Sequence, residues 1–172
     1  MTQQSKVETF VVHDDGTFPG NALPVVLYRQ AIAPDRRVDP AQALIDRFEA
    51  NGWDNAWRNG IFDFRHYHAT THEVLGCARG SVRVELGGPQ GRELELHAGD
   101  IVVLPAGTAH MNLGHSDHYV IVGAYPPGQS ADMRYGKNGE RPQADREIGK
   151  VPRPRTDPVY GESGPLLDAW SD

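Results

Sequence analysis

The sequence predicts an all-β domain, an antiparallel sandwich or barrel, with one short N-terminal helix and an extended C-terminal segment. Between residues 60 and 125, apolar side chains recur at every second position in short runs, as in strands with one buried face. The chain has 19 glycines and 13 prolines, many of them between these runs, which indicates tight turns. Its 172 residues suit a single domain over 1–172, with a barrel core at about 58–126 and a wrapping segment at 127–172.

The N-terminal part of the chain predicts two strands and the helix. Residues 7–13 and 23–28 have strand-like composition, and Pro24 should place the second strand at a sheet edge, because proline donates no ladder hydrogen bond. Residues 40–51 predict the helix, since Asp39 can cap it, a proline suits its first position and its apolar residues share one face.

The next runs place specific side chains on defined faces. Phe62 and Phe64 alternate with the same phase as His66 and His68, so we expect one strand with all four directed into the barrel. Glu73 begins the following strand. Further strands are expected at 82–86, 94–96, 101–104 and 119–125.

Residues 127–172 are rich in glycine, proline and charge. A disordered tail is the simplest interpretation, but disordered segments usually contain fewer apolar residues. We therefore expect this segment to wrap the barrel or a neighbouring subunit. Its candidate anchors are Ile148, Val151, Val159, Tyr160, Leu166, Leu167 and Trp170.

Composition also excludes several classes of function. The formal net charge of −6 is unfavourable for a protein that binds nucleic acid through its phosphates. No run is long and apolar enough to span a membrane, and the first ten residues lack the apolar centre of a signal peptide. The single cysteine, Cys77, cannot form an intrachain disulfide and is expected to be a small buried apolar residue. We expect a cytoplasmic protein with no nucleic-acid or membrane partner.

Candidate metal ligands lie in the segment Gly60-x5-His66-x-His68-x4-Glu73-x6-Gly80. His66 and His68 are two residues apart, so on a strand their imidazoles point to the same side. A tight connection would return the Glu73 carboxylate towards them. A fourth ligand would have to come from a distant strand.

The segment Gly99-x5-Pro105-x-Gly107-x2-His110 offers that ligand. A turn at Gly99 precedes a short apolar strand. Pro105 and Gly107 then bend the chain, so that His110 begins the return strand. His110 could thus face the same interior as the other three ligands.

These two segments, in this order, resemble the two sequence motifs of the cupin superfamily. The second departs after His110, where the family often has asparagine four residues later and this chain has Gly114, with Asn112 two residues earlier. HYHATTHEVLG, GAYPPGQ, GKNGERPQAD and DPVYG also resemble the uncharacterised YjlB-type bacterial cupins. The resemblance implies an RmlC-like jelly roll, or double-stranded β-helix, which the strand pattern favours independently.

Three imidazoles and one carboxylate, from His66, His68, Glu73 and His110, suit one divalent ion of iron, manganese, nickel, cobalt, copper or zinc. An octahedral ion would keep two positions for other ligands. The alternative is a site that no longer binds metal, whose four polar groups would each need other partners. His72 could replace His68 as a ligand, although its position beside Glu73 favours the opposite face of the strand.

Other side chains could line the pocket or support the ligands. These candidates are His72, Asn112, His118 and Tyr125, with His118 expected near the barrel mouth. The ligand set favours a metal-dependent enzyme of the oxygenase or isomerase type, acting on a small polar organic molecule. The alternatives are a non-catalytic module that binds a small molecule or metal, and a structural protein braced by its metal. We also expect a homodimer, paired through the N-terminal strands.

Overall fold

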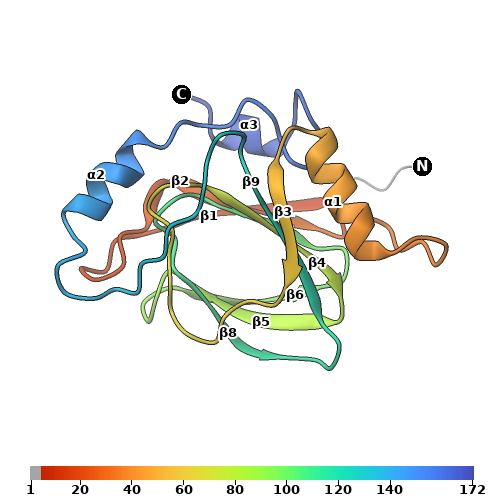
Figure 1. Ribbon diagram of the computed structural model, residues 1–172, viewed down its shortest axis with the longest axis horizontal. Coiled ribbons are helices and arrows are strands. Elements are labelled where there is room, and N and C mark those ends of the chain that lie inside the picture. The colour runs from red at the N-terminus through yellow and green to blue at the C-terminus, as the bar shows by residue number, and fades with distance from the viewer. Residues whose placement is uncertain (1–4) are drawn as a thin grey trace.

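The computed structural model describes residues 5–172, which form two antiparallel sheets and three helices (Figure 1). The strands are β1 (Lys6–Val12), β2 (Asn21–Arg29), β3 (Asp54–Asn59), β4 (Glu73–Arg79), β5 (Ser81–Leu86), β6 (Arg92–His97), β7 (Ile101–Leu104), β8 (His110–His115) and β9 (Val120–Tyr125). The helices are α1 (Pro40–Ala50), α2 (Gln143–Lys150) and α3 (Pro165–Ala169). Within residues 5–172, no helix is both long and apolar enough to cross a bilayer.

The two sheets pack against each other through their apolar faces. The larger has the strand order β1-β2-β7-β4-β9-β3 and the smaller β6-β5-β8. Leu75 and Val102 of the larger sheet share a buried cluster with Val82 and Leu96 of the smaller. The all-β class is confirmed, and the order of the strands is consistent with a jelly roll. The larger sheet also includes β1, β2 and β3, most of whose residues precede the core expected at 58–126.

A second apolar cluster covers the outer face of the larger sheet. Helix α1 contributes Leu44 and Phe48 to it. The sheet admits the helix closely at Gly76, where an added Cβ would lie 3.0 Å from Leu44 and 3.2 Å from Phe48. The predicted helix is confirmed together with its cap, because the Asp39 side chain accepts a hydrogen bond from the Ala41 amide at 3.0 Å.

The position of β2 corrects the expectation of an edge strand. β2 lies between β1 and β7, and β1 forms the edge of the sheet. Pro24 is accommodated because β7 pairs only with Val26–Tyr28, and because the β1–β2 register shifts between Phe10 and Val12, opposite Pro24. The sequence also gave no indication of β3, a polar edge strand that pairs with β9.

The strand expected at 62–68 is wrong. This stretch lies in the loop between β3 and β4, which makes only isolated bridges, His66 with His110 and Tyr67 with Arg134. Phe62 and Phe64 are 53% and 41% exposed, so they do not share the buried position of the histidines. The alternation of aromatic residues in this stretch therefore does not reflect the two faces of a strand.

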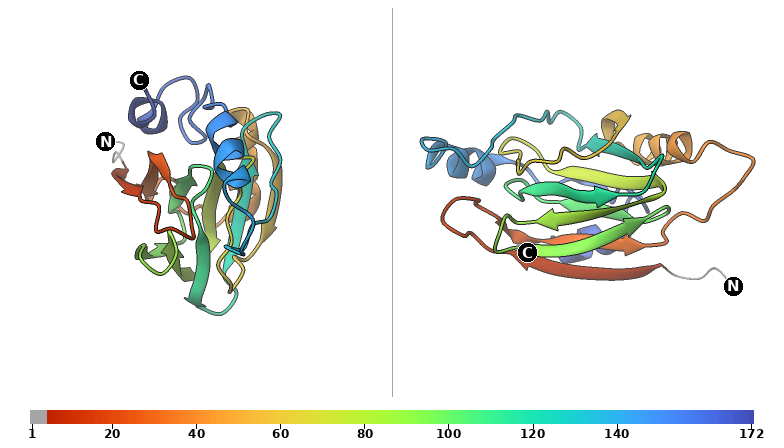
Figure 2. Two further views of the ribbon diagram at one scale, coloured as in Figure 1. Left: turned by 90° about the vertical axis from the view of Figure 1, so that its left-hand side faces the viewer. Right: turned by 90° about the horizontal axis from the view of Figure 1, so that it is seen from below.

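The C-terminal segment runs along the outside of the sheets of its own chain (Figure 2). Val159, Leu166 and Trp170 are buried in the cluster that α1 also covers. The buried Asp157 carboxylate accepts hydrogen bonds from the Tyr28 hydroxyl at 2.7 Å and from three backbone amides of the segment. The segment thus packs against the sheets of its own chain, and it is not extended throughout, because α2 and α3 lie within it.

Candidate metal centre

Three imidazoles converge between the sheets. His66 and His68 come from the loop before β4, and His110 begins β8. The backbones of His66 and His110 pair through two hydrogen bonds, of 3.3 and 2.9 Å. All three side chains are buried, and one ring nitrogen of each lies within 4.8 Å of the others. This three-histidine group could therefore hold a metal ion.

The carboxylate of Glu73 faces this group. Glu73 is the first residue of β4, which pairs with β7 and β9 at the centre of the larger sheet. Its Oε1 lies 3.5 Å from Nε2 of His68 and 3.4 Å from Nε2 of His110. The side chain is buried, so water cannot readily satisfy the carboxylate.

The other ring nitrogen of each histidine is already engaged. Nδ1 of His66 lies 2.9 Å from the Phe64 carbonyl oxygen, and Nδ1 of His110 lies 3.0 Å from that of Thr108. Nδ1 of His68 lies 2.6 Å from the carbonyl oxygen of Asp132. A carbonyl oxygen only accepts, so each Nδ1 must carry the proton. In the neutral rings the Nε2 lone pairs then face one another and the carboxylate.

Such an arrangement suits a cation at its centre. Glu73 Oε1 has no hydrogen-bond partner among the described residues, although it is fully buried. Imidazole nitrogens with their Nδ1 protons held by carbonyls, together with a carboxylate, form a typical donor set for a first-row divalent ion. The residues present therefore fit such an ion.

Protonation of the histidines cannot supply that positive charge equally at all three rings. Burial and the neighbouring His110 lower the pKa of His66 to about 3, so His66 stays neutral. Burial opposes a charge on His68, but the Glu73 carboxylate outweighs it and raises the pKa of His68. Burial likewise opposes a charge on Glu73, yet His110 and His68 hold its pKa below the usual range. Without a metal, a proton shared by His68 and Glu73 is the available substitute.

A cavity of about 240 Å³ adjoins the imidazoles. This is smaller than the roughly 300–1,000 Å³ typical of sites for drug-sized ligands. Besides the four candidate ligands, its walls include apolar side chains from β3, β4 and two loops. These are Trp57, Ile61, Phe62, Leu75, Ala131 and Met133. The cavity thus combines one polar end with a mainly apolar body.

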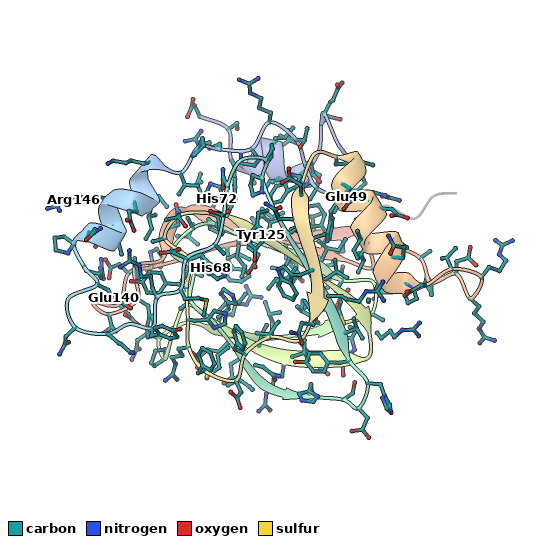
Figure 3. All side chains as sticks on the ribbon, in the orientation of Figure 1. Glu49, His68, His72, Tyr125, Glu140 and Arg146 are labelled. Carbon is teal, nitrogen blue, oxygen red and sulfur yellow. The ribbon has the colours of Figure 1, made fainter. Side chains whose placement is uncertain are left out.

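Tyr125 lies in this cavity, as one of the candidate pocket residues. Figure 3 shows Tyr125 and His68 inside the ring of strands. The Tyr125 hydroxyl accepts a hydrogen bond from Nε1 of Trp57 at 3.0 Å. Burial and the nearby Glu73 charge raise the pKa of Tyr125, so it keeps its proton and can donate it in a hydrogen bond.

The other candidates lie outside the cavity. His72 is buried, but its Nδ1 accepts from the Ala106 amide at 2.9 Å and its ring packs against Trp170. It therefore faces the C-terminal segment and does not replace His68 in the cluster. Asn112 donates to the Tyr119 hydroxyl at 3.1 Å. His118 is exposed in the β8–β9 turn, at the opposite end of β8 from His110, and does not line the cavity.

Several cavity residues were missed in the sequence. Trp57 belongs to β3, whose polar composition hides its strand character. Ala131 and Met133 come from the C-terminal segment, beside the backbone pairing of Tyr67 with Arg134. No local pattern connects residues so far apart, so only the tertiary fold could place them here.

The chain is similar along almost its whole length to one curated bacterial protein. It is 35% identical over 168 residues to the uncharacterized protein YjlB of Bacillus subtilis (strain 168), covering 97% of this chain and 98% of YjlB. The chain belongs to the YjlB family. The two motifs and the facing antiparallel sheets of this YjlB-family member resemble those of the cupin superfamily. No family model matches it.

Two solved structures are weakly similar to this YjlB-family chain. Acireductone dioxygenase from Bacillus anthracis, with a cadmium ion in its active centre, is 19% identical with a TM-score of 0.37, over 49% of this chain and 57% of that enzyme. The dTDP-6-deoxy-D-glucose-3,5-epimerase RmlC from Legionella pneumophila is 12% identical with a TM-score of 0.41, over 70% of this chain and 71% of the epimerase. These scores are low, so the fold and site rest on the chain's own residues.

Proposed function

We propose that this protein binds one divalent first-row transition-metal ion through His66, His68, Glu73 and His110. We further propose that it is a metal-dependent enzyme of the oxygenase or isomerase type. One observation carries the proposal. In each of the three histidines, Nδ1 is bonded to a carbonyl oxygen, so Nε2 is left free to face the other two rings and the unpartnered Oε1 of Glu73. The ion is iron, manganese, nickel, cobalt, copper or zinc, which accept this donor set.

The cavity suggests what kind of molecule would bind. A divalent ion held by three neutral imidazoles and one carboxylate keeps one positive charge, which favours a singly charged oxygen donor. Among the described lining residues only Arg58 is cationic, and its Nη1 donates to Asp39 at 3.1 Å. We therefore propose a small molecule with an oxygen-bearing end and an apolar body, which is less polar than the sequence suggested.

The remaining groups have defined roles in this scheme. When bound, the ion would supply Lewis acidity or redox capacity. Tyr125 would donate its hydroxyl proton in a hydrogen bond to the oxygen-bearing end of the ligand, since the hydroxyl oxygen already accepts from Trp57. Phe62 lines the cavity from the loop and would limit access of water.

We also propose that the protein is a homodimer that pairs along β1. This strand is the edge of the larger sheet, and only its β2 side is paired among the described residues. An uncovered edge is a natural site for pairing with a second copy. The cytoplasmic location stays a prediction from the sequence.

Elemental analysis of protein purified without chelator or nickel affinity resin should find one first-row ion per chain. The protein is then loaded with cobalt and titrated with 2-keto- and 2-hydroxy-acids of increasing apolar chain length, followed in the visible spectrum. We expect affinity to rise with chain length until the cavity is filled, and Tyr125→Phe to weaken binding. A cobalt spectrum that responds neither to these acids nor to azide would show a closed structural site. A response without turnover, with or without oxygen, would favour a non-catalytic binding module.

A further inference from the structure

His68 takes its orientation from a distant part of the chain. Its Nδ1 donates to the carbonyl oxygen of Asp132 at 2.6 Å, across 64 residues of sequence. His66 and His110 instead bond to carbonyls two residues before them, those of Phe64 and Thr108. The turns of their own loops thus orient His66 and His110, whereas the C-terminal segment orients His68.

The carboxylate of Asp132 holds the backbone that follows His68. Its Oδ1 accepts hydrogen bonds from the amides of Ala69 and Thr70, at 2.7 and 3.2 Å, and from the Thr70 hydroxyl at 3.0 Å. One residue therefore fixes both the ring of His68 and the chain that carries it. A shift of Asp132 would move the ring and its backbone together.

Asp132 is itself anchored from the opposite side. Its Oδ2 accepts from Nε of Arg134 at 2.9 Å, and Nη2 of Arg134 donates to Glu147 of α2 at 2.7 Å. The backbones of Tyr67 and Arg134 also pair through two hydrogen bonds, of 2.9 and 3.0 Å. These contacts connect α2 to the loop that carries His68, so Asp132 is held in place from both sides.

We propose that Asp132 is a positioning residue of the metal centre, which aims Nε2 of His68 at the ion from the C-terminal segment. This inference rests on the proposed function, because it concerns the same ion. Residues that hold the second nitrogen of a metal-bound histidine fix the orientation of the ring and its strength as a ligand. Losing such a partner typically lowers metal affinity by roughly 10- to 100-fold.

The test compares two variants of Asp132 with a matched control. Asp132→Ala removes the carboxylate contacts to Ala69 and Thr70, whereas Asp132→Asn keeps one oxygen acceptor for them. The control is Asp145→Asn in the same C-terminal segment, where Asp145 accepts from Arg141 at 2.8 Å and makes no hydrogen bond to the His68 loop. Each full-length protein is titrated with cobalt, and its affinity and visible absorption spectrum are recorded.

The carbonyl that bonds His68 belongs to the backbone and stays in every variant, so the carboxylate acts on His68 indirectly. We therefore expect cobalt affinity to fall by up to roughly 10-fold in Asp132→Ala, and by less in Asp132→Asn. The visible bands should change in Asp132→Ala, because the His68 nitrogen no longer approaches the ion at the same angle. Asp145→Asn should bind with the affinity and bands of the wild type. A loss of general stability alone would not alter the bands of protein that remains folded.

A folded Asp132→Ala with wild-type affinity and bands would overturn the inference. If Asp132→Ala does not fold, Asp132→Asn and Thr70→Val are compared with the wild type instead, because each removes part of the same contacts. Wild-type cobalt affinity in both of these variants would also overturn the inference. Wild-type protein that takes up no cobalt would refute the proposed function and this inference with it. If the wild type binds cobalt and the Asp132 variants bind it equally well, this inference alone is refuted.

Discussion

A bound metal should stabilise the folded protein by an amount that can be calculated. A ligand present at about 100 times its Kd stabilises the folded state by roughly 2.7 kcal/mol. The entropy of unfolding is about 2.1 cal/mol/K per residue, which gives about 0.36 kcal/mol/K for 172 residues. The melting temperature should therefore rise by about 7 °C when the preferred ion is added at that excess.

Removing one imidazole should abolish most of this rise. His66→Ala and His110→Ala each delete a nitrogen of the converging group, and the buried position offers water little access to replace it. His97→Ala is the matched control, because the side chain of His97 is 57% exposed on β6, outside the cluster. Thermal unfolding of each metal-free protein is followed by circular dichroism, and the ions are then added one at a time.

The informative quantity is the shift on adding metal, since each substitution can change the starting stability. The His97→Ala protein should keep the full shift. A shift of wild-type size in both His66→Ala and His110→Ala would show that the ion binds elsewhere. The four-ligand centre would then be wrong.

Four further predictions concern the rest of the molecule. Trp170 is 3% exposed, so Trp170→Ala should destabilise the fold by about 3–5 kcal/mol, and an unchanged denaturation curve would contradict docking of the C-terminal segment. Burial lowers the pKa of His72 from 6.5 to about 4, so only the unfolded chain takes up a proton between these values. Stability should thus fall by up to roughly 3 kcal/mol as the pH drops from 6.5 to 4, and denaturation midpoints should show less of this fall in His72→Asn. Burial raises the pKa of Cys77 to about 12, so iodoacetamide at neutral pH should modify it only after unfolding, and rapid labelling of the folded protein would oppose this. Light scattering at micromolar concentration should give the mass of a dimer, and the mass of a monomer would reject pairing along β1.

Local signals predicted the elements that depend on local rules. Helix α1 was predicted because its cap, its first proline and its apolar face all lie within a few residues of one another. Strands β5 and β6 were predicted because apolar residues at every second position leave one face for the core. Helix α2 was missed because it is short and buries only Ala144 among its residues, so it shows little apolar periodicity.

Non-local contacts explain the errors near the site. Alternation at 62–68 suggested a strand, but no neighbouring strand forms a continuous ladder with this stretch. Its phenylalanines stack on each other, with ring centroids 4.9 Å apart, and remain exposed. Apolar residues at every second position do not form a sheet unless a neighbouring strand pairs with them. The sequence alone does not show which segment lies alongside.

The convergence of the imidazoles was nevertheless predicted, although for a different physical reason than expected. The pleat of a strand does not align His66 and His68. His66 is placed by its backbone pairing with His110, and His68 lies beside the Tyr67–Arg134 pairing, with its ring bonded to Asp132. The motif therefore specifies which side chains can bind an ion, whereas a contact across 64 residues specifies where one of them points. It follows that metal affinity in this protein should report on the docking of the C-terminal segment as well as on the ligands themselves.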